Sequence, residues 1–355
     1  MKPRLVIIGG GIAGISCGAR AAADFDVTVL EAEMQPGYHA SGRSAAVSIE
    51  SYMNEVVHAL TVESNVYFRA EGAKPMSCIT IADAEHGAEL DAFLAEWLPL
   101  CPQIREISVE ETLRRVPILR PEGIARVIDD PNTLGLDAHG LLDGFRRRLV
   151  AAGGRVVNNA RVGRIEQLAP GWRVWVGETA FEAEVLVNAA GAWADQVAAL
   201  AGVRPLGLKP YRRTALLVDP GRDVSAWPLV HRAEGGLYFK PEAGLLMVSL
   251  AEETPSEPCD AQPEELDVAV AVDRFQQMTT LEVRRLGQTW AGLRTFLPDR
   301  FPAAGFDSRV NDFFWLVGQG GMGMQTAPAL SQAAADMLAG RPSRFAEMLS
   351  PARAF

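Results

Sequence analysis

The sequence predicts an α/β protein made of two interleaved domains, one with a parallel sheet and the other with an antiparallel sheet. Strand–helix units stand at both ends of the chain, over residues 5–31 and from residue 313 onward. Residues 203–250 instead alternate apolar and polar side chains, which is typical of an antiparallel sheet with one solvated face. Because sheet-rich blocks interrupt the strand–helix units, we expect one domain at 1–72, 140–202 and 305–355, and the other at 73–139 and 203–304.

The N-terminal unit begins with an apolar strand at residues 5–8, which runs into the glycines Gly9, Gly11 and Gly14. An alanine-rich helix follows, and a second strand at 27–30 ends on Glu31. Gly9 allows the tight turn, Gly11 lets the backbone approach a pyrophosphate, and Gly14 lets the helix pack on the sheet. Glu31 is placed to accept hydrogen bonds from a ribose. This is the fingerprint of a Rossmann-like dinucleotide-binding domain, and it leaves NAD and FAD open as ligands.

Hydrophobic periodicity predicts the elements between these ends. Helices are expected at 55–70, 84–98, 141–152, 194–201 and 264–286. Strands are expected at 76–82, 155–157, 163–168, 172–177, 184–187, 213–218, 236–240, 245–249 and 288–296. The strand at 184–187 stops on small residues before a helix, which lets the backbone approach a ligand at the carboxyl end of the strand.

The C-terminal unit consists of a strand at 313–317, a glycine-rich loop and a helix entered near residues 326–328, where Pro328 suits a first turn. The loop holds four glycines, at positions 318, 320, 321 and 323. Consecutive backbone N–H groups at a helix N-terminus form a site for negative charge. We therefore interpret the loop as a binding element and not as a plain turn.

Composition excludes several classes of protein. The 355 residues are 48% hydrophobic and 22% charged, which is ordinary for a globular chain of about two domains. The net charge of −10 argues against nucleic acid as a partner. The four cysteines lack C-x-x-C spacing and the five histidines lack metal-ligand spacing, so we expect no metal site. No run reaches the roughly 18 apolar residues of a membrane span. We expect a cytoplasmic protein, or one peripheral to the inner membrane.

Five further sequence blocks bear on which dinucleotide binds: residues 35–46, 187–193, 201–207, 289–294 and 319–326. Through them the chain resembles the FAD-dependent D-amino acid oxidase superfamily, which includes glycine oxidase and sarcosine oxidase. It looks closest to the bacterial D-arginine dehydrogenase type. The resemblance covers nearly the whole chain, and it implies FAD, bound non-covalently, as the cofactor.

The resemblance also assigns residues. It implies that Arg294 and Arg213 bind the substrate carboxylate, that the Tyr238 hydroxyl assists them, and that Tyr52 closes over the site on a mobile loop. The N–H groups of 318–326 would support negative charge on the reduced flavin. The expected cofactor-binding residues are Gly9, Gly11, Ile12, Ala13, Gly14, Glu31, Ala32, Arg43, Ser44, Ala45, Val162, Ala190, Gly191, Trp193, Arg294, Gly320, Gly321, Met322, Gly323, Met324 and Gln325.

Three departures from the D-arginine type bear on the substrate. That type carries a glutamate just after the proline matching Pro75, where this chain has Met76. It also has a histidine at the position of Val47, and an aromatic residue at the position of Met322. Each change makes the expected substrate pocket (Val47, Met76, Met322) less polar, and a cationic side chain would be costly there.

We therefore expect oxidative deamination of neutral or apolar D-amino acids to 2-oxo acids, by hydride transfer to the flavin. One alternative is that another acid, such as Glu50 or Glu55, supplies a charge for a basic substrate. Others are a secondary amine such as sarcosine, a 2-hydroxy acid, or an accessory flavoprotein subunit. The electron acceptor (a quinone, another carrier or O₂) stays open.

Overall fold

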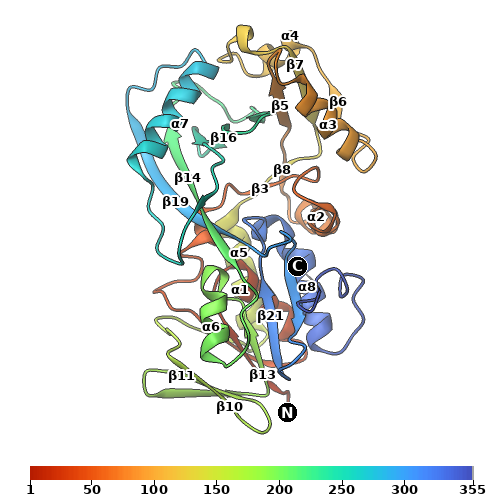
Figure 1. Ribbon diagram of the computed structural model, residues 1–355, viewed down its shortest axis with the longest axis vertical. Helices are drawn as coiled ribbons and strands as arrows, with labels where there is room; N and C mark the ends of the chain where they lie inside the picture. The colour runs from red at the N-terminus through yellow and green to blue at the C-terminus, as the bar shows by residue number, and fades with distance from the viewer. Residues whose placement is uncertain (354–355) are drawn as a thin grey trace.

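The computed structural model describes residues 1–353 as two lobes stacked along the long axis of the molecule (Figure 1). The N-terminus lies in the lower lobe of this view, together with the parallel sheet. The upper lobe holds the larger, mainly antiparallel sheet. The long strands β14 (Lys209–Val218) and β19 (Leu286–Phe296) run from one lobe toward the other. The mixed α/β fold expected from the sequence is confirmed.

The parallel sheet has the order β20-β21-β13-β1-β2-β9. Ile8, at the end of β1, pairs with Leu30 on one side and with Asn188 on the other, so these three strands end at one edge. Only β20 is antiparallel to its neighbour. The strands are β1 (Arg4–Ile8), β2 (Asp26–Leu30), β9 (Arg155–Val157), β13 (Val185–Asn188), β20 (Ala303–Phe306) and β21 (Phe313–Val317).

Helices cover this sheet, and α1 packs against both α5 and α8. The buried apolar faces of these helices meet the buried strand residues in one hydrophobic core, which leaves the carboxyl edge of the sheet for a ligand. The helices of this lobe are α1 (Ile12–Ala21), α2 (Glu55–Ala70), α5 (Ala138–Ala151), α6 (Ala194–Leu200) and α8 (Gly323–Leu338), with short 3₁₀ turns at Ala40–Arg43 and Gly191–Trp193. A three-stranded antiparallel sheet extends the lobe: β10 (Arg164–Gln167), β11 (Trp172–Val176) and β12 (Thr179–Ala183).

The larger sheet has the order β18-β14-β17-β16-β15-β5-β7-β6, with β19 also paired to β14. Its core includes Phe239, whose ring meets that of Phe275 edge-on at 5.4 Å. The remaining strands are β5 (Cys78–Ala82), β6 (Arg105–Glu106), β7 (Arg126–Asp130), β15 (Leu229–Arg232), β16 (Tyr238–Glu242), β17 (Leu245–Ser249) and β18 (Thr254–Pro255). The helices are α3 (Gly87–Trp97), α4 (Val109–Arg115) and α7 (Glu265–Met278), with a 3₁₀ turn at Pro121–Gly123.

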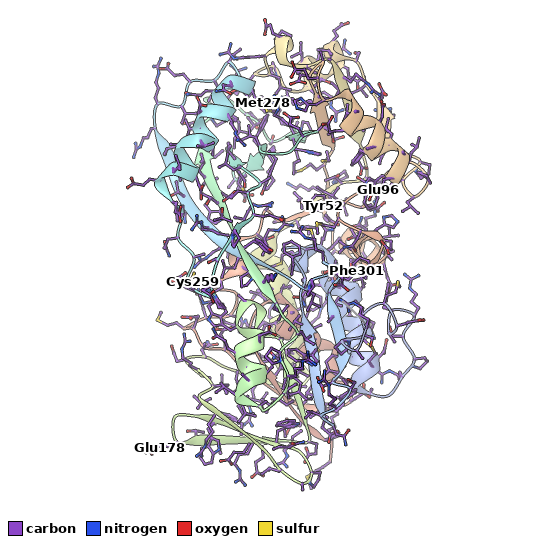
Figure 2. The ribbon with its side chains drawn as sticks, in the orientation of Figure 1. Tyr52, Glu96, Glu178, Cys259, Met278 and Phe301 are labelled. Atoms are coloured by element: carbon purple, nitrogen blue, oxygen red, sulfur yellow. The ribbon has the colours of Figure 1, made fainter. Side chains whose placement is uncertain are left out.

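A small sheet of three two-residue strands completes the structure: β3 (Val47–Ser48), β8 (Leu134–Gly135) and β4 (Lys74–Pro75). It joins segments that flank α2 to the segment that precedes α5. Residues 47–52 are thereby held between the two lobes, where Tyr52 lies (Figure 2).

Several predicted bounds are wrong. Helix α7 ends at Met278 and not at 286, because the extended backbone of Thr279 ends the helix and its hydroxyl donates to the Phe275 carbonyl. Helix α8 begins at Gly323, so Pro328 lies inside the helix and not in its first turn. Strands β15 and β20 were not expected, and β20 starts at Ala303, ahead of the predicted boundary at 305.

Candidate active site

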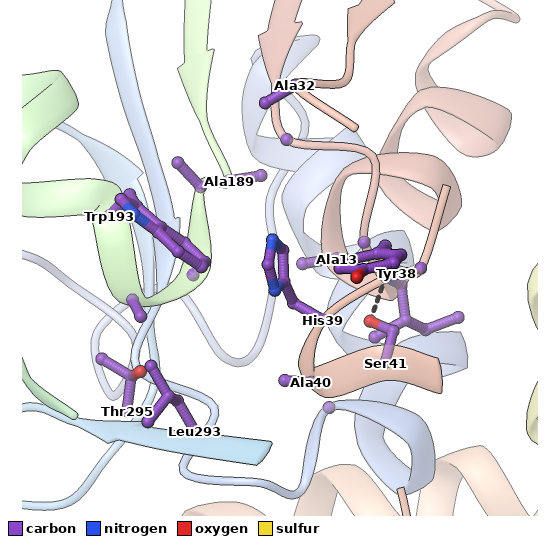
Figure 3. Close-up of a pocket in the computed structure, with 18 of the residues that line it drawn as sticks. Ala13, Ala32, Tyr38, His39, Ala40, Ser41, Ala189, Trp193, Leu293 and Thr295 are labelled. Atoms are coloured by element: carbon purple, nitrogen blue, oxygen red, sulfur yellow. Dashed lines mark hydrogen bonds between the residues drawn. The ribbon is translucent and has the colours of Figure 1, made fainter. Parts of the chain in front are cut away.

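A cavity of about 270 Å³ opens at the carboxyl edge of the parallel sheet. Figure 3 shows Ala13 and Ser41 on one side of it, and Ala189 and Trp193 on the other. Leu293 and Thr295, from β19, lie at a third side. This first cavity is the place where the fingerprint predicts a dinucleotide.

Two glycines of the fingerprint, Gly9 and Gly14, meet steric demands that no other residue satisfies. Gly9 has φ +112°, and a Cβ there would lie 2.3 Å from the Ala189 carbonyl oxygen. A Cβ on Gly14 would lie 2.0 Å from the Gly9 carbonyl oxygen. Gly14 therefore serves close packing between turn and helix, and it does not line the cavity, which corrects its prediction as a cofactor contact.

Glu31 lines the cavity although it is only 8% exposed. Its Oε2 accepts a hydrogen bond from the Gly10 amide at 2.7 Å, and its Oε1 accepts one from the Glu33 amide at 2.8 Å. Each carboxylate oxygen offers two lone pairs, so both can accept a further donor from a ligand. The arrangement fits the predicted ribose-binding role of Glu31.

His39, to which the sequence analysis assigns no role, lines the same cavity. Its ring lies 4.6 Å from the ring of Trp193, and its Nε2 lies 3.1 Å from Glu33 Oε1. The other ring nitrogen, Nδ1, is buried without a hydrogen-bond partner among residues 1–353. A buried polar atom in a cavity calls for a partner, which a bound polar ligand would supply.

Arg43 anchors the loop that follows β2 at the wall of this cavity. Its Nη1 donates to the carbonyls of Ala261 and Ala291, both at 2.8 Å, and its Nη2 pairs with Asp260 at 2.5 Å. These bonds tie the loop after β2 to β19 and to the loop before α7, so Arg43 shapes the cavity wall.

The glycine-rich loop before α8 packs closely against β19. A Cβ on Gly320 would lie 2.2 Å from the Phe296 ring, and one on Gly321 would lie 2.3 Å from Arg294 Nε. Both glycines have positive φ, +57° and +84°. The loop lays its backbone against the cavity and delivers the N-terminus of α8, whose first-turn N–H groups have no carbonyl partner in the helix.

The predicted cofactor residues divide between this cavity and a neighbouring one. Those that line the first are Gly9, Gly11, Ile12, Ala13, Glu31, Ala32, Arg43, Ser44, Val162, Ala190, Gly191, Trp193, Gly320, Gly321, Gly323 and Met324. Those that line only the second are Ala45, Arg294, Met322 and Gln325. The cavities share the lining residues Ala40, Arg43, Ser44, Gly292, Leu293, Gly321 and Met324, and so they meet.

The second cavity has a volume of about 370 Å³ and lies between the lobes. It brings together the four predicted catalytic residues Arg294, Arg213, Tyr238 and Tyr52. They come from β19, β14, β16 and the loop before α2, segments far apart in the chain. Tyr211 and Arg294 pair across β14 and β19, so Arg213 lies near Arg294 on the neighbouring strand.

The two arginines are positioned through their Nε atoms. Arg294 Nε donates to the Gly320 carbonyl at 2.8 Å, and Arg213 Nε donates to the Glu252 carbonyl, also at 2.8 Å. Arg294 is only 7% exposed, and its Nη2 has no hydrogen-bond partner among the described residues. Burial and the charge of Arg294 lower the pKa of Arg213 from its ordinary value. An anion between these groups would satisfy the free donor and offset the repulsion between the charges.

Two tyrosines border the arginine pair. Burial works to raise the pKa of Tyr52, but the charges of Arg294 and Arg213 outweigh it and lower the pKa below the usual value. For Tyr238, burial is the stronger effect and raises the pKa. A phenol hydroxyl can donate a hydrogen bond to a carboxylate.

Away from the arginines, the cavity is bordered by Thr80, His231 and Asp130. His231 Nε2 lies 2.7 Å from Thr80 Oγ1, and burial lowers the pKa of His231 to about 4, so the ring is neutral at pH 7. Asp130 Oδ2 accepts a hydrogen bond from Ser51 at 2.6 Å, and burial raises the pKa of Asp130. Sequence reasoning missed these polar residues, because they follow no motif.

Of the predicted substrate-pocket residues, Val47 and Met322 line the second cavity and Met76 does not. The amide of Met76 donates to the Thr133 carbonyl, and the side chain lies against Gly135 in the small sheet. Including Met76 in the pocket was therefore wrong, since pairing of β4 with β8 points residue 76 elsewhere. Neither Glu50 nor Glu55 lines the cavity, whereas Asp130 does.

Comparison with known proteins decides the family. The model of the DAO family, described as FAD dependent oxidoreductase, matches residues 4–337. The chain belongs to this family. The predicted superfamily is thus confirmed, and the protein is an FAD-binding flavoprotein, whereas the finer likeness to D-arginine dehydrogenase stays a prediction.

The curated relatives of this DAO-family protein are distant. FAD-dependent oxidoreductase domain-containing protein 1 of Xenopus laevis is 27% identical over 227 residues, which is 56% of this chain and 44% of that protein. Mouse mitochondrial sarcosine dehydrogenase is 24% identical over 255 residues, or 67% of this chain and 28% of that protein. This chain therefore spans between about a quarter and two thirds of the length of the curated relatives it matches.

Solved structures show the same fold over the whole chain. Glycine oxidase from Geobacillus kaustophilus superposes with a TM-score of 0.89 at 20% identity, covering 100% of this chain and 99% of that one. L-proline dehydrogenase from P. horikoshii gives 0.88 at 21% identity, covering 99% and 97%. In residues 1–353, no helix has both the length and the apolar character needed to cross a membrane.

FAD fits the two cavities. Gly9 and Gly11 line the first cavity, where they would face a pyrophosphate, and Glu31 keeps lone pairs for a ribose. The loop of Gly320 and Gly321 brings the α8 N-terminus to the place where the cavities meet. Negative charge on a reduced flavin would be favoured at that helix end.

Proposed function

We propose that this protein oxidises D-amino acids to 2-oxo acids and ammonia with its bound FAD. The observation that carries the proposal is the pair of buried Arg294 and half-buried Arg213 beside the junction of the cavities, with one guanidinium donor of Arg294 left free. A planar guanidinium binds a carboxylate through two parallel hydrogen bonds, which fixes the orientation of the whole molecule.

The site residues would act by positioning the substrate. Arg294 and Arg213 hold the carboxylate, and the Tyr238 and Tyr52 hydroxyls complete its hydrogen bonds. This fixes the α-carbon near the shared wall of the cavities, and such orientation supplies much of the rate of a reaction of this kind. When bound, FAD accepts the hydride equivalent from the Cα–H bond. His231, which lines the second cavity, is hydrogen-bonded to Thr80 and neutral at pH 7.

Tyr52 gives the proposal a pH signature. As the pH rises through its lowered pKa, the phenol becomes a phenolate, which competes with a carboxylate for Arg294 and Arg213. We expect the affinity for benzoate, which does not titrate in this range, to fall before the ordinary tyrosine pKa of 10.0 is reached. In Tyr52→Phe this loss should disappear, while binding at lower pH weakens by about 10-fold or more, because one hydrogen bond to a charged group is gone.

Titration of the flavin absorbance with benzoate between neutral and alkaline pH measures this effect. Tyr67→Phe is the matched control, since Tyr67 packs on Phe145 in the helices of the lower lobe, outside both cavities. If benzoate affinity depends on pH in the same way in the wild type and in Tyr52→Phe, Tyr52 does not contact the carboxylate.

For the side chain of the substrate, we propose neutral or apolar groups. Val47, Met322 and Met247 supply apolar walls, together with Leu229 and Leu237. Methionine adapts to varied apolar shapes, which suits a range of side chains. A panel of D-amino acids with an artificial electron acceptor tests this: D-leucine, D-methionine and D-phenylalanine should react faster than D-arginine and D-lysine.

A second candidate, basic D-amino acids, is favoured by Asp130. Asp130 lines the cavity at 2% exposure, and its carboxylate accepts hydrogen bonds from the Ser51 hydroxyl and the Asn132 amide. It has no arginine or lysine within 4.0 Å in the described part of the chain. Under our first proposal, Asp130→Asn leaves kcat/KM for D-leucine nearly unchanged. If basic substrates are the natural ones, the same variant would instead lower kcat/KM for D-arginine by about 30-fold or more, since a buried ion pair is lost.

Secondary amines remain an outcome of the same panel, since mouse sarcosine dehydrogenase is among the relatives. Reaction with sarcosine and with no primary D-amino acid would redirect the proposal to N-alkyl substrates. If a 2-hydroxy acid reacts and no amine does, the proposed amino acid specificity is wrong. A protein that reacts only when a partner chain is added would instead be an accessory subunit.

A further inference from the structure

The loop between β17 and β18 brings one carboxylate to the arginine pair. Glu253 Oε1 lies 3.7 Å from Arg213 Nη2 and 3.6 Å from Arg294 Nη1. The Glu253 side chain is 29% exposed and is not part of the lining of the second cavity. It thus approaches both guanidinium groups without occupying the space that a substrate carboxylate would fill.

Glu253 acts on these arginines through charge. Both distances exceed that of a hydrogen bond, whereas each Nε is held at 2.8 Å by a backbone carbonyl, of Glu252 or of Gly320. The positions of Arg213 and Arg294 therefore rest on the backbone. What Glu253 adds is a negative charge within 4 Å of two positive ones, in a half-buried setting where such charges interact strongly.

Arg300 holds Glu253 in this position. Its Nη2 forms an ion pair with Glu253 Oε2, and its guanidinium lies over the Phe296 ring, 4.2 Å from the centroid. Burial works to raise the pKa of Glu253, but the Arg300 guanidinium, with Arg294 and Arg213, outweighs it and lowers the pKa. Glu253 is therefore ionised near pH 7. Arg300 contacts both of its carboxylate oxygens, and Oε1 also faces the arginine pair.

We infer that Glu253 acts through the charge of the Arg213–Arg294 pair and limits the affinity of this pair for a carboxylate, and that Arg300 keeps Glu253 from binding the pair itself. The inference rests on the proposed function, in which this pair binds the substrate carboxylate. Substrate and 2-oxo acid product both carry that carboxylate. Without a nearby negative charge, the two guanidinium groups would bind the product so tightly that it dissociates slowly. Glu253 partly neutralises their positive charge and so weakens product binding.

Two substitutions should act in opposite directions. Glu253→Gln keeps the shape and removes the charge, so benzoate should bind about 3- to 10-fold more tightly, and the effect should shrink at high ionic strength. Arg300→Gln removes a positive charge and frees Glu253 to move onto the arginine pair, so benzoate should bind more weakly. Loss of structure would weaken binding in both variants, which separates this role from a merely structural one.

The experiment titrates the FAD-loaded protein with benzoate and follows the flavin absorbance. Glu257→Gln is the matched control, since Glu257 is an exposed acid just after β18 with no ion pair in the described residues. With the best amino acid of the panel, Glu253→Gln should also lower KM without raising kcat.

Unchanged or weaker benzoate binding in Glu253→Gln overturns the inference while leaving the carboxylate site intact. Tighter benzoate binding in Arg300→Gln overturns the inference as well. If Glu253→Gln does not fold, the benzoate affinity of Arg300→Gln is by itself the test. If wild-type protein binds no benzoate and no amino acid, the proposed function itself fails. The two failures are thus distinguishable.

Discussion

Replacing Arg294 with methionine is expected to lower kcat/KM for an amino acid substrate by about 100-fold or more, the loss typical of a buried charge-assisted pair. Arg294 is 7% exposed, is held at Nε by the Gly320 carbonyl, and has its Nη2 free for a ligand. Methionine fills similar space but cannot bind a carboxylate. Most of the loss should appear in KM, since the contact to the carboxylate exists before the reaction begins.

Steady-state kinetics of Arg294→Met, with Arg222→Met as control, measures this effect. Arg222 is exposed and outside both cavities, so its loss should change neither constant. The FAD content of each variant should be determined as well, because Arg294 also touches the loop of Gly321. A FAD-loaded Arg294→Met protein with wild-type kcat/KM would show that the carboxylate binds elsewhere.

The second large effect concerns the cofactor. Gly9→Ala is expected to yield protein without bound FAD, because the new Cβ would lie 2.3 Å from the Ala189 carbonyl oxygen. The backbone at φ +112° adds strain of about 1–3 kcal/mol for any other residue. The turn must move away from β13 to relieve both the steric clash and the backbone strain. This turn is the surface against which the pyrophosphate would lie.

Flavin absorbance of the purified variant, before and after incubation with FAD, tests this prediction. Gly144→Ala is the control: Gly144 lies inside α5, and no atom would come within 4 Å of its Cβ. That substitution should keep FAD and raise the free energy of unfolding by about 0.5–1 kcal/mol, since alanine favours helix more than glycine does. Normal FAD content in Gly9→Ala would contradict our account of the turn.

Local signals made much of the fold predictable. The apolar runs of β1 and β2, the glycines between them and the terminal Glu31 all lie within one short segment, so their spacing alone indicates the turn and the strand order. The periodicity of α2 and of β19 likewise depends on residues close in sequence. By contrast, β15 pairs in parallel with β5, more than 140 positions away, and no local pattern records such a partner.

The site was predictable where a motif carries it. Arg294 and the glycine loop stand in recognisable blocks, and the structure brings both to the junction of the cavities. Asp130, His231 and Glu253 stand in no such block, because their role depends on which strands lie side by side. Met76 was misplaced for the same reason, since β4–β8 pairing decides where residue 76 points.

The most direct test of the proposed function is anaerobic reduction of the FAD-loaded protein by one enantiomer at a time. We predict that D-leucine or D-methionine bleaches the flavin and yields one equivalent of 2-oxo acid and of ammonia per flavin, while the L-enantiomers do not. Arg294→Met should show the same bleaching only at much higher concentrations. Absence of bleaching by every D-amino acid, with bleaching by an L-amino acid or by sarcosine, would contradict the assignment.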